Sequence, residues 1–105
     1  MEVDVDRLKN HLEELARIPR PAESEPLERA RRYVDEQFQQ AGWSVEPISF
    51  IAQFDGGSRL RGINLVAQHP RPPLPNNAPR FCVGAHLDSI PTSPGADDNA
   101  TAIAT

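Results

Sequence analysis

A run of prolines between residues 70 and 79 constrains the fold of this chain more than any other sequence feature. Five of these ten residues are proline. Proline supplies no amide donor and fixes φ, so the run cannot form a helix or a central strand. We interpret it as a stiff surface connection between two strands. Residues 71–75 also suit recognition by a polyproline-binding module, and such a docking role is the alternative.

Two amphipathic helices are predicted before this run. Pro19 and Pro21 end the first helix, because proline disfavours helix at the residue before it. Ser24 is the predicted N-cap of the second helix, Pro26 is tolerated in its first turn, and Gly42 stops it. Apolar side chains recur at helical spacing in both stretches: Leu8, Leu12 and Leu15 in the first, and Leu27, Ala30, Val34, Phe38 and Ala41 in the second.

Three strands are predicted around the proline run. Residues 45–54 and 59–68 form a hairpin, since the four residues between them include two glycines, which can take the positive φ of a tight turn. Residues 81–85 are almost continuously apolar, which predicts a strand buried on both faces of a sheet. Cys82 lies in that strand, so we expect a buried, unreactive thiol. As the single cysteine it forms no internal disulfide. A further helix is predicted to begin near Ala100.

Composition and charge exclude several classes of function. The formal net charge is −4, so a polyanionic partner such as nucleic acid is not expected. No apolar run approaches the roughly twenty residues that span a bilayer, and the N-terminus lacks the basic start and apolar stretch of a secretory signal. We therefore expect a cytoplasmic protein without membrane contact. The length of 105 residues allows one small domain over 1–105, and leaves the oligomeric state open.

Residues able to carry chemistry gather near the C-terminal end. His86 directly follows the predicted buried strand, so its side chain should emerge at the carboxyl end of that strand, where α/β sheets bind ligands. Asp88, two residues later, is placed to hold one imidazole nitrogen and raise the basicity of the other. Asp97 and Asp98 are adjacent carboxylates, which repel each other unless a cation or a proton lies between them.

Each of these residues alone has a simpler interpretation. A lone histidine at a strand end is more often a hydrogen-bonded structural residue than a metal ligand. Asp97 or Asp98 alone would serve as the N-cap of the helix that begins near Ala100. None of these residues identifies a metal site by itself, and the interpretation depends on the whole string, in which His86 stands twelve positions before Asp98.

The whole string resembles the motif of the dinuclear zinc aminopeptidases of metallopeptidase family twenty-eight. The resemblance lies in Gly-Ala-His-Leu-Asp-Ser at 84–89 and, after a short loop with Pro and Gly, in Gly-Ala-Asp-Asp-Asn at 95–99. It implies that His86 binds one zinc ion and that Asp98 bridges two zinc ions. It also implies that Asp88 serves catalysis by orienting His86.

Four further expectations come from the same resemblance. Asp97 would line the loop without bridging the metals, and the peptide bond from Asp98 to Asn99 would be cis. The fold would be α/β, the N-terminal part of a zinc-exopeptidase-type (phosphorylase/hydrolase-like) three-layer α/β/α sandwich with a mixed sheet. The activity would be removal of N-terminal residues from peptides with a free N-terminus, using two zinc ions and an activated water.

The resemblance also implies that this chain is an incomplete part of such an enzyme. The general-base glutamate and the remaining metal ligands, a carboxylate pair and a histidine, would follow the position of Thr105, and the chain alone would be inactive. An apolar helix that stops after one turn points the same way. Two alternatives stay open: an intact, non-catalytic interaction module, or part of a related glutaminyl cyclase or carboxypeptidase-like metallohydrolase.

Overall fold

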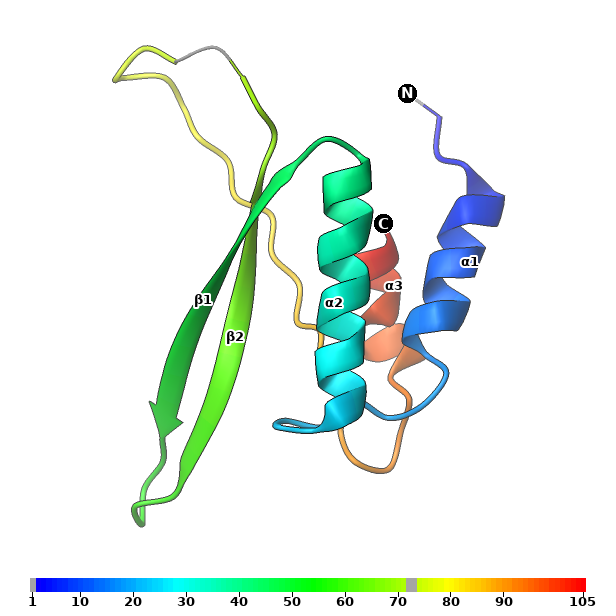
Figure 1. Cartoon of the computed structure of the whole chain (residues 1–105), viewed down its shortest axis with the longest axis vertical. Helices are drawn as coiled ribbons and strands as arrows, with labels where there is room; N and C mark the ends of the chain where they lie inside the picture. The colour runs from blue at the N-terminus through cyan, green and yellow to red at the C-terminus, as the bar shows by residue number, and fades with distance from the viewer. Residues whose placement is uncertain (1, 72–73) are drawn as a thin grey trace.

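The computed structural model describes residues 2–71 and 74–105. Within these ranges the chain is a mixed α/β structure, as predicted, with helices packed together on one side of a long hairpin (Figure 1). The full three-layer sandwich stays a prediction. The elements in chain order are α1 (Val5–Leu15), α2 (Glu25–Gln40), β1 (Ser44–Gln53), β2 (Arg59–Gln68), the turn η1 (Ala96–Ala100) and α3 (Thr101–Ala104).

Side-chain caps begin both long helices. Asp4 accepts a hydrogen bond from the amide of Arg7 at 3.1 Å at the start of α1. The Ser24 hydroxyl accepts from the amide of Leu27 at 3.2 Å at the start of α2. These bonds satisfy amides that have no partner within the helix. The predicted cap at Ser24 is confirmed, and Gly42 follows the end of α2 as predicted.

The hairpin is antiparallel, as predicted from the turn residues. Ser44 lies opposite Gln68 at one end of the ladder, and Gln53 lies opposite Arg59 at the other. Gly56 and Gly57 take φ values of 88° and 86° in the connecting turn, a region that glycine enters without steric cost.

A small apolar core joins the two N-terminal helices to the C-terminal end of the chain. Leu15 of α1, Ala30 and Val34 of α2, and Ala100 of η1 form one buried cluster. The same packing is visible in Figure 1, where α3 lies between α1 and α2. This core fixes the start of the C-terminal helix against the long helices. In the described residues, no helix is both long and apolar enough to cross a membrane.

The prediction of a buried strand over residues 81–85 is wrong. No strand forms there, and the side chains of Phe81 and Val83 are 93% and 96% exposed. Cys82 is exposed too, so the predicted burial of its thiol is also wrong. A strand needs hydrogen bonds to a neighbour, and the one sheet of the described residues contains only β1 and β2. The proline run therefore does not connect two strands, and Pro72 and Pro73 of its docking motif lie outside the described residues.

Candidate metal site

His86 lies between two carboxylates. Its Nδ1 atom is 3.1 Å from Oδ1 of Asp88 and equally far from the backbone carbonyl oxygen of Asp88. Its Nε2 atom is 2.9 Å from Oδ1 of Asp98. The structure thus brings together the three residues that the sequence singles out as ligands and orienting group. All three are exposed, with about half of the His86 side chain open to solvent.

The two nitrogens of the ring face different partners. Nδ1 faces only acceptors, so it carries a hydrogen and donates to Asp88. Nε2 also faces a carboxylate oxygen, and it can donate to Asp98 only when the ring is protonated and positively charged. Partial burial lowers the pKa of His86, but the hydrogen bonds to Asp98 and Asp88 outweigh it and raise the pKa above its ordinary value.

The neutral ring creates a place for a cation. When His86 loses its second proton, the lone pair of Nε2 faces a lone pair of Asp98. That contact is repulsive unless a positive ion is shared between the two atoms. Neutral imidazole and carboxylate oxygen are both zinc ligands, with Asp88 holding the other ring nitrogen in the way that metal-bound histidines favour.

These residues fit part of a zinc site. Among the described residues no group of three or more His, Cys, Asp and Glu side chains is placed to hold a metal ion. Asp88 does not add a third ligand, because it bonds to the side of the ring opposite Asp98. A zinc ion normally takes three or four protein ligands, so His86 and Asp98 supply part of the set.

The loop that carries Asp98 has the features that the resemblance implies. The Asp98–Asn99 peptide bond is cis. Gly95 precedes η1 without any side-chain cap, so neither aspartate acts as the N-cap that was the simpler interpretation. The backbone carbonyl of Asp97 accepts a hydrogen bond from the Thr101 hydroxyl at 3.3 Å, and its side chain is exposed.

An arginine that sequence analysis missed holds the segment in place. His86 does not leave a buried strand, so the predicted reason for its position is wrong. Instead the amide of Ser89 donates to the carbonyl of Arg20 at 2.9 Å, and Arg20 reaches the carbonyl of Leu87 with its side chain. The only sequence signal is an arginine between Pro19 and Pro21, which does not distinguish it from a surface residue.

Comparison with known families bears on the same residues. Residues 64–105 match the model of Peptidase family M28. That part of the chain is therefore similar to peptidase family M28. The match covers the whole segment from His86 to Asp98, so the resemblance inferred from the motif is confirmed, and with it a metal-dependent peptidase family. A search of curated proteins found no match to the chain.

Proposed function

We propose that this chain supplies the first part of the two-zinc site of an aminopeptidase. The observation that carries the proposal is the approach of His86 Nε2 to Asp98 Oδ1 at 2.9 Å, with Asp88 on the opposite ring nitrogen. Two potential ligands face each other at the surface, and a family match covers both.

His86, Asp98 and Asp88 have different roles in the proposed metal site. His86 binds one metal through Nε2, since Nδ1 is committed to Asp88. Asp98 has two carboxylate oxygens, which allow it to hold a second metal while the first oxygen stays near His86. Asp88 keeps the ring in the tautomer that leaves Nε2 free. Bound zinc supplies Lewis acidity that polarises a scissile carbonyl and activates water.

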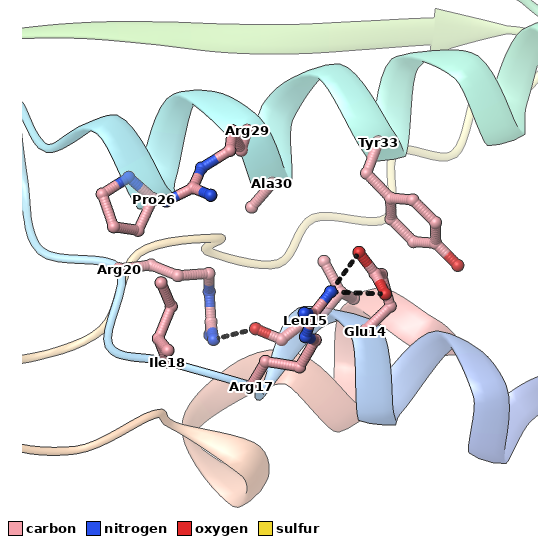
Figure 2. Close-up of a pocket in the computed structure, with 9 residues that line it drawn as sticks. All are labelled: Glu14, Leu15, Arg17, Ile18, Arg20, Pro26, Arg29, Ala30 and Tyr33. Carbon is pink, nitrogen blue, oxygen red and sulfur yellow. Dashed lines mark hydrogen bonds and ion pairs between the residues drawn. The ribbon is translucent and has the colours of Figure 1, made fainter.

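The proposed substrate class is supported by the resemblance to the dinuclear zinc aminopeptidases and not by a pocket. The cavity between α1 and α2 (Figure 2) is lined by Glu14, Arg20 and Tyr33 among others, and by neither His86 nor Asp98. His86 and Asp98, the proposed metal-binding pair, lie on an open surface, which suits a site completed by other residues. We propose a peptide with a free N-terminus as substrate, with the general-base glutamate and the other ligands outside these 105 residues.

Hydrolysis of aminoacyl anilides tests this proposal. The assay compares this chain with the full protein encoded by its reading frame, in zinc and after chelation. We expect no activity from the chain alone, and zinc-dependent release of amino acids, but not from N-acetylated substrates, by the full protein. His86→Ala and Asp98→Ala should abolish it, while Asp97→Asn, a matched change beside the ligand, should retain most of it.

Three outcomes would contradict the proposal. Activity that survives His86→Ala would remove the histidine from the metal site. A full protein that cyclises N-terminal glutamine, or acts on acylated substrates, would keep the metal site and assign it to the alternative reactions. Full activity of the chain alone would show that its own residues complete the site.

A further inference from the structure

Arg20 is the most deeply buried charged residue of the described chain. Its exposed fraction is 2%, and it follows α1 in the short connection to α2. Figure 2 shows its side chain running between the two helices, with the guanidinium directed at the backbone carbonyl of Leu15. Burying a guanidinium costs free energy of folding unless its donors are paired. The hydrogen-bond partners of Arg20 therefore indicate which parts of the chain it holds together.

The donors of Arg20 reach three different parts of the chain. Nε donates to the carbonyl of Leu87 at 2.9 Å. Nη1 donates to the carbonyls of Leu15, in the last turn of α1, and of Pro94. The remaining nitrogen, Nη2, has no hydrogen-bond partner among the described residues.

Two of these carbonyls belong to the segments that carry the metal-binding pair. Leu87 stands directly after His86, and Pro94 begins the loop that leads to Asp98. The backbone of Arg20 adds two bonds to the first segment, since its amide donates to the hydroxyl of Ser89 at 2.7 Å and its carbonyl accepts from the Ser89 amide. Residues 81–88 form no strand, so the bonds to Arg20 fix this segment where hydrogen bonds to a neighbouring strand would otherwise do so.

The chemistry of arginine suits this task. The planar guanidinium offers five donors in a fixed geometry, and so it spans carbonyls that a single ammonium group cannot reach together. Burial lowers the pKa of Arg20, while the carboxylate of Asp88 opposes that effect. The arginine nevertheless keeps its charge, because its ordinary pKa lies far above neutral pH.

We propose that Arg20 is a positioning residue of the metal site, which holds the His86 and Asp98 segments in register on the end of α1. The proposal rests on the proposed function in so far as the pair binds metal. The juxtaposition of the two side chains is independent of that function. The side chain of Arg20 bonds to backbone carbonyls of the two segments and of α1, and not to the side chains of His86 or Asp98.

Zinc titration and NMR of this chain test the proposal. Arg20→Met removes every side-chain donor. Arg20→Lys keeps the positive charge but lacks the planar guanidinium that reaches several carbonyls at once. Ser24→Ala is the control for a general loss of stability, because the Ser24 hydroxyl caps α2 through the Leu27 amide and lies outside the core cluster. Three quantities are measured for each protein: zinc affinity by calorimetry, the ring ¹⁵N shifts of His86 without zinc, and hydrogen exchange of the Ser89 amide.

We expect both arginine variants to weaken zinc binding roughly tenfold to a hundredfold, as the loss of groups that orient ligands commonly does. Their His86 ring shifts should move toward those of a free histidine, and Ser89 should exchange faster. Ser24→Ala should lower the unfolding midpoint and leave the His86 ring shifts and the zinc affinity unchanged. If Arg20→Met fails to fold, the zinc affinity and the His86 ring shifts of Arg20→Lys test the positioning role.

The design separates the two proposals. If zinc binds neither this chain nor the full protein, but Arg20→Lys still shifts the His86 ring signals, the proposed function fails and the positioning role stands. If a folded Arg20→Lys keeps wild-type shifts and affinity, the positioning role is wrong. An equal loss of affinity in Ser24→Ala would also overturn it, because the effect would then be one of stability.

Discussion

The Nε2 atom of His86 and the Oδ1 atom of Asp98 lie 2.9 Å apart, although neither residue belongs to a strand or a long helix. The two side chains are 51% and 83% exposed, so they are not pressed together by burial. Their approach results from the backbone on either side, which is tied to Arg20 and to the small core.

This contact predicts a raised pKa for His86 that depends on the two carboxylates. Hydrogen bonds to Asp98 and Asp88 favour the charged ring more than partial burial disfavours it. Asp98→Asn or Asp88→Asn should therefore lower the pKa of His86 toward its ordinary value, as measured by NMR titration of the ring. Asp97→Asn is the matched control and should leave that pKa unchanged.

The direction of the shift also fixes how the contact depends on pH. A raised folded-state pKa means that the contact stabilises the fold below the ordinary value of about 6.5 and that this stabilisation is lost as pH rises through the folded-state pKa. Zinc affinity should increase over the same interval, since zinc competes with the proton on Nε2. A His86 pKa at or below the ordinary value would contradict the prediction.

Local sequence signals predicted the helices and the hairpin, because each depends on residues close in the chain. Ser24 caps α2 through an amide three residues away, and two glycines turn the hairpin. The sequence also singled out His86, Asp88 and Asp98, which the structure brings together, because they lie within one continuous motif. Their role as metal ligands and orienting group stays a prediction.

The errors involve contacts between distant parts of the chain. Residues 81–85 have the composition of a buried strand, yet strand formation needs a partner strand, which composition does not supply. Arg20 lies 67 residues before Leu87, and nothing local to Arg20 indicates that its side chain is buried. Periodicity predicts which residues face a core, but not which backbone carbonyls a buried arginine will reach.

Gly95→Ala should destabilise the loop before Asp98. Gly95 has a φ of 63°, and an added Cβ would lie 2.5 Å from the carbonyl oxygen of Asp98 and 2.9 Å from Cβ of Ser89. The expected cost is about 1–3 kcal/mol in the free energy of unfolding, measured in urea. Gly84→Ala is the control, because no atom of the described residues lies within 4 Å of its added Cβ. Equal stability of the two variants would show that the loop adapts to the side chain.

Loss of the cap at Ser24 should weaken α2. The Ser24 hydroxyl is the acceptor for the Leu27 amide, and Ser24→Ala should cost about 0.5–2 kcal/mol in the free energy of unfolding. Ser58→Ala in the hairpin turn is the matched change, since Ser58 is exposed, and it should stay within about 0.5 kcal/mol of wild type. If both variants unfold at the same urea concentration, the cap contributes nothing measurable.

Ionisation of Tyr33 should destabilise the protein in alkali. Burial and then the charge of Glu14 raise the pKa of Tyr33 above its ordinary value, and its hydroxyl lies 2.6 Å from Nδ1 of His11. The neutral form therefore stabilises the fold below about pH 10, and this contribution is lost as pH rises through the raised pKa.

Tyr33 is the single tyrosine of the chain, so its ionisation can be followed by ultraviolet absorbance without interference from other tyrosines. We expect the folded protein to titrate at higher pH than the protein in denaturant. Urea unfolding between pH 8 and pH 11 should show a decline in stability that Tyr33→Phe removes. A tyrosine that titrates equally in both states would mean that α1 does not shield it, and the contact between His11 and Tyr33 would then be too loose to join α1 to α2.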